Sequence, residues 1–445
     1  MSAAKSQTPM ESKLEALQCH FTWGINLSRA TLFRFTDKLE DIVADEGNSW
    51  LGHIYNLQGF IHYKLGLTED AQSFFSRAAE GFHQMRKAAS DEGPWLMVNY
   101  GNQAWLHHHL GQEAESQAYL SKVDALMNKY PSPSQEELHP EIYAEKAWTL
   151  MKFSRYTKAL VVDYFERAIR MQPDMVEWGT SHTLALLHGF SDGNTGSHTD
   201  ILEKIRKAKE QHPENLYLAV QYLNQLAKKG ENIKHEAREL AIKVLRNPVS
   251  SYSGMKALLM VFMKYISANE AIDLAEEALK QHPDERYLKR CVALCYKWRI
   301  IYFRDSQSSD KSMIDRAIIL HKEVISLYPH SSLVKKIDLA NIYAKSKDGL
   351  EQAERMYQEL LESDLEPADR QMLYNHYAKY LNFDQHDGKG SIKYHMKAAE
   401  IPQQSFFRSN SIRVLERIKD RNRTFLCGDI EEFLAQQQKL SSTII

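Results

Sequence analysis

Apolar residues recur along this chain at the three- and four-residue spacing of amphipathic helices, and short polar connections separate successive runs. One such run reads NLQGFIHYKLGLTEDAQSFFSRAAE over residues 56–80. Gly66 would end a first helix there, because glycine readily adopts the left-handed conformation found at helix ends. The small residues Gly59 and Ala78 and the bulky Phe75 lie where two antiparallel helices would pack closely. The run therefore predicts a helical hairpin.

The same order of small, turn and bulky positions recurs at irregular intervals, often followed by a proline that stops the second helix. The matching positions are Ala104 and Gly111; Phe165, Ala168 and Pro173; Ala271, Ala275, Ala278 and Pro283; Ala317, Val324 and Pro329; Ala340, Tyr343, Ala353 and Tyr357; and Ser391, His395 and Ala398. Hairpins with this order are typical of tetratricopeptide repeats (TPRs), which stack on their neighbours. We predict an all-α TPR superhelix of roughly eight hairpins, with a concave central groove or tunnel.

Two polar stretches interrupt the helical pattern and indicate loops between hairpins. One is the Gly-, Ser- and Asn-rich end of residues 179–200, and the other is RDSQSSDKS over residues 304–312. The parts that we expect are an N-terminal helical cap (1–47), an N-terminal TPR subdomain (48–200), a central TPR subdomain (201–335) and a C-terminal TPR subdomain with a tail (336–445).

Composition limits the structural class and the cellular location that we expect for the chain. Only 19 glycines and 12 prolines occur in 445 residues, which favours long helices with short connections. The four cysteines are too few and too scattered for a disulfide framework. No signal peptide and no apolar stretch of membrane-spanning length occurs in the sequence. The formal net charge of −2 gives no general sign of nucleic-acid binding but allows a local basic surface. We expect a cytoplasmic protein without a membrane partner.

No residues in the sequence have the spacing of a catalytic or metal site. The chain has no Gly-rich phosphate loop, no nucleophile elbow and no zinc-protease motif. Cys291 and Cys295 share a helix face without further ligands nearby, so core packing explains them better than a metal. His107, His108 and His109 point about 100° apart on a helix and do not converge on one ion. We expect no enzyme, no metal and no cofactor.

Basic and aromatic residues do share helix faces. Trp148 and Lys152 lie four residues apart, and Tyr156 follows one turn later. Leu184 and His188 repeat the four-residue spacing on a later helix. If the helices stack in order, these faces would line the same concave wall.

Two further cations belong to this candidate wall, namely Lys256 and Arg290, and Lys297 shares a face with Arg290 seven residues on. A groove lined by cations and aromatic rings suits a phosphate backbone with stacked bases. Aromatic residues at helical spacing also pack in ordinary cores, so the pattern alone indicates only a helical scaffold that binds some partner.

Several stretches resemble one particular family of TPR proteins. They are LEALQCHFTWGI (14–25), NLQGFIHYKLG (56–66), PEIYAEKAWTLMKFSRY (140–156), LCYKWRII (294–301) and IDLANIYAKSKDGLEQAERMYQELL (337–361). Together they resemble the interferon-induced proteins with tetratricopeptide repeats, and the likeness runs from about residue 11 to about residue 420. The HFTW start and the LCYK segment are quite specific within TPR proteins.

The resemblance implies an interferon-induced, cytosolic antiviral protein. Several members bind viral RNA with a 5′-triphosphate, or with a cap that lacks ribose methylation, in a positively charged groove and sequester it from translation. Others bind duplex or AU-rich RNA as dimers, or act as adaptors to relatives. The partners that we expect are therefore the 5′ end of single-stranded viral RNA and a homo- or hetero-oligomer with family members. The alternative is a TPR adaptor in antiviral signalling without 5′-end specificity.

The resemblance also implies roles for individual residues. Lys38, Lys152 and Tyr156 match positions that contact 5′ phosphates. Trp148 matches the aromatic residue that stacks on a cap base, and Leu184 matches an aliphatic residue packed nearby.

Two further positions, Lys256 and Arg290, correspond to residues that contact RNA in the family. Three other positions depart from the family pattern. Ile42 and His188 stand where a Gln and an Arg meet the phosphates, and Cys291 stands where a Gln lines the groove. Each lost charge-assisted hydrogen bond would cost about 1.5–3 kcal/mol. We therefore expect weaker phosphate-end specificity, partly compensated by Lys38 and Arg290.

Overall fold

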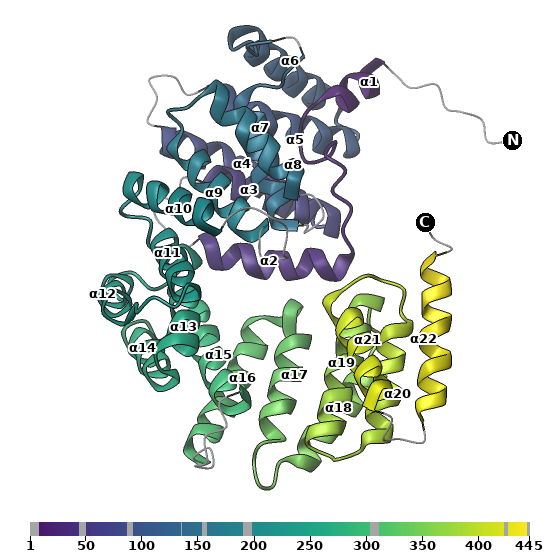
Figure 1. Cartoon of the computed structure of the whole chain (residues 1–445). Coiled ribbons are helices and arrows are strands. Elements are labelled where there is room, and N and C mark those ends of the chain that lie inside the picture. The colour runs from purple at the N-terminus through teal and green to yellow at the C-terminus, as the bar shows by residue number, and fades with distance from the viewer. Residues whose placement is uncertain are drawn as a thin grey trace, which may run out of the picture. The chain divides into compact units, whose positions relative to one another are not determined.

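The computed structural model describes residues 9–43, 50–86, 92–134, 136–153, 158–189, 198–302, 311–421 and 426–442. These residues are helical almost throughout, and no strand occurs among them (Figure 1). The prediction of an all-α chain is therefore confirmed.

The chain divides into two compact units, Met1–Ile266 and Ser267–Ile445. The helices of the first unit are α1 (Pro9–Ala16), α2 (Arg29–Val43), α3 (Leu51–Leu65), α4 (Thr68–Arg86), η1 (Pro94–Leu96), α5 (Met97–His109), α6 (Glu113–Lys129), α7 (Pro140–Phe153), α8 (Lys158–Met171), α9 (Val176–Gly189), α10 (His198–Gln211), α11 (Leu216–Lys228), α12 (Lys234–Val244), η3 (Ser251–Ser253), α13 (Met255–Val261) and η4 (Phe262–Ile266). The pairs α3–α4, α5–α6 and α7–α8 each pack as a hairpin. The finer, four-part division that the sequence suggests stays a prediction.

The second unit continues the same architecture. Its helices are α14 (Ala268–Gln281), α15 (Arg286–Tyr302), α16 (Lys311–Leu327), η5 (Pro329–Ser331), α17 (Ser332–Tyr343), α18 (Leu350–Glu362), α19 (Pro367–Phe383), α20 (Gly388–Glu400), α21 (Phe406–Arg421) and α22 (Cys427–Ser442). Neighbouring helices along the chain pack against each other, as Figure 1 shows for α17 to α22.

The α3–α4 hairpin shows why the small and bulky positions recur. A Cβ atom at Gly59 would lie 2.6 Å from the ring of Phe75, so α3 and α4 approach this closely only because the residue is glycine. Gly66 has φ = 84°, and its amide caps the end of α3. Phe75 and Ala78 are both fully buried. The hairpin predicted for residues 56–80 is therefore confirmed.

The segment before α2 is fixed by a buried polar network. The backbone amide of His20 donates to Oδ1 of Asn102 (3.0 Å), which orients the Asn102 amide so that Nδ2 donates to Nδ1 of His20 (3.0 Å). Nε2 of His20 must then carry the proton and donate to Oγ1 of Thr149 (3.2 Å). Burial lowers the pKa of His20 to about 3, so the ring stays neutral. The family-like HFTW residues thus join α5 to α7.

Within the described residues, four hairpins share an arrangement that we call the aromatic–cation triad. In each, aromatic rings from the two helices lie 5.6–6.2 Å apart, and a cation three residues after the second ring lies 4.3–5.7 Å from at least one ring centroid. The triads are Tyr55, Phe74 and Arg77; Tyr100, Tyr119 and Lys122; Tyr143, Tyr164 and Arg167; and, in the second unit, Tyr374, Tyr394 and Lys397. Cation–π contacts of this type stabilise the packing of the two helices within one hairpin.

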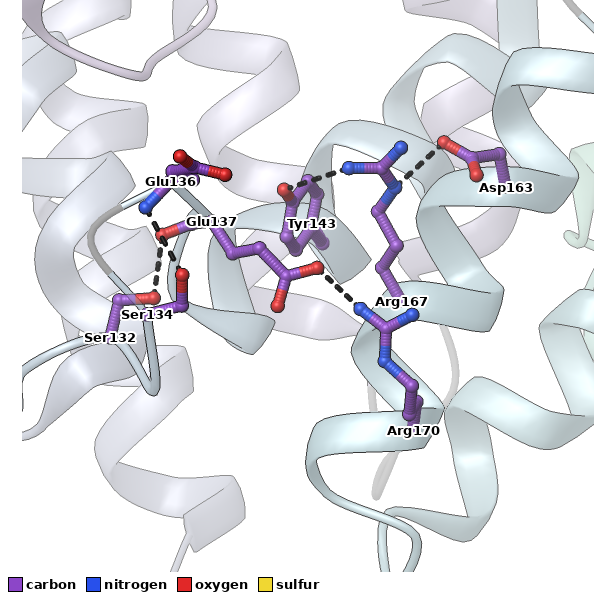
Figure 2. Close-up of polar contacts among 8 residues, drawn as sticks. All are labelled: Ser132, Ser134, Glu136, Glu137, Tyr143, Asp163, Arg167 and Arg170. Atoms are coloured by element: carbon purple, nitrogen blue, oxygen red, sulfur yellow. Dashed lines mark hydrogen bonds and ion pairs between the residues drawn. The ribbon is translucent and has the colours of Figure 1, made fainter.

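The start of α7 is tied to α8 by polar contacts around one triad (Figure 2). Arg167 donates to Asp163 (2.9 Å) and to the hydroxyl of Tyr143 (3.5 Å). One turn away, Arg170 pairs with Glu137 in the segment that leads into α7. These contacts hold the helix that carries most of the candidate site.

Candidate nucleic-acid interface

Trp148 on α7 lies in the hydrophobic core of the first unit. Its side chain is 1% exposed and stacks on Trp50 at the start of α3, with ring centroids 5.5 Å apart and an interplanar angle of 15°. Phe165 of α8 meets Trp50 edge-on at 6.5 Å. Trp148 therefore has no ring face open to a ligand as it stands, and stacking on a base requires a neighbour to move.

Lys152 lies one helical turn after Trp148, and its Nζ atom is 4.3 Å from the centroid of the indole ring. The four-residue spacing on α7 produces this contact, as the sequence predicts. Burial, and to a smaller extent the charge of Lys38 on α2, lower the pKa of Lys152 to about 7. The effect of Lys38 on this pKa indicates that the two ammonium groups repel each other, and a bound anion would relieve that repulsion.

Lys38 is exposed on α2 beside an aromatic pair that the sequence analysis did not single out. Its Nζ atom lies 5.3 Å from the ring of Phe35, and Phe35 meets Phe153 of α7 edge-on at 4.6 Å. Both phenylalanines are half-buried. The sequence could have indicated both rings, because Phe35 precedes Lys38 by three residues on the same helix and Phe153 directly follows Lys152.

A buried chain of hydrogen bonds holds α7 against α3 and α5. Gln103 donates to Asn99 (2.7 Å), Asn99 donates to Asn56 (2.8 Å), and Asn56 donates to Glu145 (2.8 Å). Burial raises the pKa of Glu145 to about 8, the hydrogen bond from Asn56 opposes this rise, and the charge of Glu141 adds to it. Since Glu145 lies on α7 two turns before Lys152, this chain positions the helix that carries the lysine.

The structure does not bring every predicted residue to this site. Leu184 of α9 is half-buried and packs on a separate cluster, formed by Leu187 of the same helix and by residues of α10 and α11. His188 lies in α9, but its side chain lies outside the described residues, as does the whole of Tyr156. These three assignments stay predictions.

Lys256 is exposed on the first turn of α13. Tyr252 of η3, four residues earlier, packs against the core cluster that contains Trp148. The 3₁₀ turn η3 also contacts α2. The chain that leads to Lys256 therefore runs past the helix that carries Lys38, and Lys256 follows one turn later.

Arg290 belongs to the second unit, where it lies in a cluster of cations around Tyr328. The guanidinium carbons of Arg286 and Arg290 lie 4.1 and 5.3 Å from the Tyr328 ring centroid, and Nζ of Lys335 lies 4.6 Å from it. Tyr328 is fully buried. Arg286 and Lys335 were not predicted from the sequence, although Arg286 shares a helix face with Arg290. Lys335 reaches the ring from α17.

Two of the departures from the family pattern are buried. Ile42 is 5% exposed and belongs to the same core cluster as Trp148. Cys291 is 1% exposed, and Cys295 one turn on is buried too, which agrees with core packing of both thiols. Position 42 therefore supplies apolar packing rather than a hydrogen-bond donor.

Neither a metal site nor a membrane span is found in the parts of the chain that the structure describes. Their His, Cys, Asp and Glu side chains form no group of three or more that could hold an ion. Within the same ranges, the helices are too short or too polar to cross a bilayer.

Sequence comparison extends this picture. The chain is 25% identical over 436 residues to the antiviral innate immune response effector IFIT1 of Macaca fascicularis, covering 94% of this chain and 89% of that protein. It is 23% identical over 432 residues to the human interferon-induced protein with tetratricopeptide repeats 2, covering 94% and 87%. Over most of its length the chain is thus similar to the interferon-induced proteins with tetratricopeptide repeats. No protein-family model matches it.

Solved structures of the relatives share the fold. A human IFIT1 dimer with m7Gppp-AAAA is 25% identical, with a TM-score of 0.66, and the match covers 97% of this chain and 96% of that one. A monomeric IFIT1 mutant with Gppp-AAAA is 23% identical, with a TM-score of 0.69, covering 97% and 100%. These likenesses confirm a TPR-type fold, and the resemblance first seen in the HFTW and LCYK segments holds over nearly the whole chain.

Proposed function

We propose that this chain is an interferon-induced antiviral effector that binds single-stranded RNA at its 5′ end and sequesters it from translation in the cytoplasm. The name of IFIT1 as an antiviral innate immune response effector supports the biological setting. Structures of IFIT1 with PPP-AAAA and with m7Gppp-AAAA support the kind of ligand. We propose a binding role and no catalytic step.

The observation that carries this proposal is the placement of Lys152. Its ammonium group lies beside a large aromatic ring, and the charge of Lys38 reaches it from another helix. The ammonium group of the half-buried Lys152 and the charge of the exposed Lys38 together favour a ligand with concentrated negative charge, such as a 5′-triphosphate or the phosphate bridge of a cap. The half-buried rings of Phe35 and Phe153 offer apolar surface beside these charges for a terminal base, and the buried ring of Trp148 would join them only after a neighbour moves.

The second unit offers a separate position for the RNA backbone. Arg286, Arg290 and Lys335 surround Tyr328, and their charges would attract phosphates through ordinary counterion release. We propose that these cations contact backbone phosphates, and that Lys256 of the first unit makes a contact of the same kind. Such contacts carry no sequence information, which suits a protein that recognises the end of an RNA.

The buried Ile42 supports a weaker phosphate-end pocket than the family pattern implies. An isoleucine has no polar atom to meet a phosphate oxygen, and at 5% exposure its side chain is part of the core. We expect the affinity for a 5′-triphosphate to depend mainly on Lys152 and Lys38.

Fluorescence anisotropy tests the proposal. One short RNA would carry a 5′-triphosphate, a cap, a monophosphate or a hydroxyl, and each would be titrated with the chain at two salt concentrations. We expect the triphosphate or capped form to bind more tightly than the hydroxyl form, and binding to weaken at high salt. Lys152→Glu should abolish the preference. Lys129→Glu is the matched control, because Lys129 is an exposed lysine whose Nζ lies 5.2 Å from the ring of Tyr130.

Equal weak binding to all four RNAs, or normal binding by Lys152→Glu, would rule out 5′-end recognition at this site. In that case the chain would act as a TPR adaptor that binds proteins. Co-purification with a family member and no nucleic-acid absorbance at 260 nm would then be expected. A human IFIT1 dimer shows that at least one relative assembles with itself.

A further inference from the structure

The ring of Trp148 is covered by two buried core residues and by one half-buried lysine side chain. Trp50 and His53 have ring centroids 5.5 and 6.4 Å from that of Trp148, and both side chains are core residues exposed by 4% and 2%. Lys152 covers the ring with an ammonium group at the end of a flexible chain, and this residue is only half-buried. Among these neighbours, Lys152 is the one that can leave the ring without disrupting the core.

The same ammonium group has two attractions that exclude each other. Over the indole it makes a cation–π contact, which corresponds to about 2- to 30-fold in an equilibrium constant. Against a phosphate it would make a charge-assisted hydrogen bond, which is the stronger interaction. A phosphate that draws Lys152 away would therefore uncover the indole, and an uncovered indole is a stacking surface for a base.

We propose that Lys152 is a latch on Trp148, so that a purine base stacks on this ring only when a phosphate of the same ligand draws the ammonium group away. This inference rests on the proposed 5′-end binding and specifies how its two parts are linked. It makes Lys152 a specificity-determining residue. A nucleoside without phosphates meets a covered ring, whereas a 5′ end with phosphates and a terminal base releases the cover and occupies the ring.

The charge of Lys38 makes it easier for Lys152 to leave the ring. Lys38 lies on a different helix and lowers the pKa of Lys152, together with burial. Part of the Lys152 population is therefore neutral near pH 7, and a neutral amine binds the indole face more weakly than an ammonium group. A phosphate arriving between the two lysines would favour the charged form and bring it to the ligand.

The test separates stacking from phosphate binding with two probes, guanosine and a 5′-triphosphate RNA. In Lys152→Ala the ring is uncovered, so guanosine should bind to it and quench tryptophan fluorescence. At concentrations that saturate this variant, guanosine should leave the fluorescence of the parent chain unchanged. The double variant Lys152→Ala/Trp148→Phe should lose the quenching, which assigns it to Trp148 among the seven tryptophans. The triphosphate RNA should bind Lys152→Ala at least tenfold more weakly than the parent.

Lys146→Ala is the matched control, because Lys146 lies on the same helix with its Nζ 5.1 Å from the ring of Tyr164. It should gain no guanosine response and keep its affinity for the RNA. If Lys152→Ala folds with the parent's circular dichroism and gains no guanosine quenching, the latch is wrong while 5′-end binding stands. If the parent binds no 5′-phosphorylated RNA, the proposed function fails and the latch with it. A guanosine response in the parent equal to that of Lys152→Ala would also overturn the latch.

Discussion

Asn56 of α3 donates a hydrogen bond of 2.8 Å to Glu145 of α7, and the Glu145 side chain is only 1% exposed. Burial raises the pKa of this carboxyl from its ordinary value of 4.5 to about 8. The unfolded chain therefore loses this proton near pH 4.5, and the folded chain keeps it until about pH 8. Between these values the folded state binds more protons, so the contribution of Glu145 to stability falls as the pH rises.

Replacing this carboxyl by a neutral amide should remove that loss. In Glu145→Gln the amide oxygen can still accept the hydrogen bond from Asn56, and nothing ionises. We expect little change in melting temperature near pH 5 and a higher melting temperature than the parent at pH 8, measured by circular dichroism across this range. Glu80→Gln, at an exposed position on α4, is the control and should follow the parent. Parallel pH profiles for Glu145→Gln and the parent would show that Glu145 is ionised in the fold.

The His20 network should be costly to break, because each of its members is buried. His20→Ala removes the partners of Asn102 Nδ2 and Thr149 Oγ1, and each group left unsatisfied costs about 1–3 kcal/mol. We expect the urea midpoint to fall clearly, whereas His235→Ala, at a side chain 82% exposed, should leave it unchanged.

The pH dependence of His20 gives an independent check. Its pKa is lowered in the fold to about 3, so between pH 3 and 6.5 the unfolded state binds more protons and stability rises with pH. His20→Ala should lose this rise. A variant as stable as the parent at pH 7, with the same acid profile, would contradict the proposed tautomer and its role.

The aromatic–cation triads should contribute to hairpin stability in the cases with the shortest contacts. Arg77 lies 4.3 Å from the Tyr55 ring centroid and also donates to the Tyr55 hydroxyl at 2.8 Å. We expect Arg77→Ala to lower the free energy of unfolding by about 0.5–1 kcal/mol, and Arg77→Lys to recover part of it. Arg170→Ala, which removes an ion pair at a side chain 63% exposed, is the comparison and should have a smaller effect. Equal losses in the two alanine variants would mean that the ring contact adds nothing.

The contrast between Gly59 and Trp148 shows how far the sequence could predict this protein. Gly59, Gly66 and Phe75 follow from local spacing, because a hairpin's close approach and its turn depend on residues within twenty positions. The contact of Lys152 with Trp148 is equally local, at one helical turn. The burial of Trp148 depends on Trp50, almost a hundred residues earlier, and no periodicity within α7 encodes that partner.

Tertiary packing also decides which partners the individual side chains meet. Leu184 and Ala185 are adjacent on α9, yet Ala185 joins the cluster of Trp148 and Leu184 packs toward α10 and α11. Because neighbouring residues on a helix point about 100° apart, a one-residue difference in phase changes the partner. Lys335 reaches Tyr328 from a helix whose own spacing gives no hint of Arg286 or Arg290. The triads were not predicted either, although their spacing is visible in the sequence: the second aromatic residue follows the first by 19 to 21 positions, and the cation follows three positions later.

The pKa of Lys152 predicts that RNA binding is coupled to proton uptake. Without ligand this pKa is about 7, because burial and the charge of Lys38 disfavour the ammonium form. A bound 5′ phosphate would favour the charged form and raise the pKa. Below about pH 6 Lys152 is already protonated and this group adds no pH dependence. Above pH 7 binding must take up a proton, so the affinity for 5′-triphosphate RNA should fall by up to about tenfold for each pH unit.

Calorimetric titrations between pH 7 and 8.5, in two buffers of different ionisation enthalpy, would count the protons taken up. Phosphate ionisation does not mask the effect in this range, because the second pKa of a phosphate monoester is about 6. Lys152→Arg is the decisive control, since a guanidinium does not lose its proton at these pH values. It should bind the triphosphate RNA with an affinity that stays flat over this range. If the parent shows the same flat profile, Lys152 is fully charged before the RNA binds. Its ammonium group is then exposed to water in solution and is not buried beside Trp148.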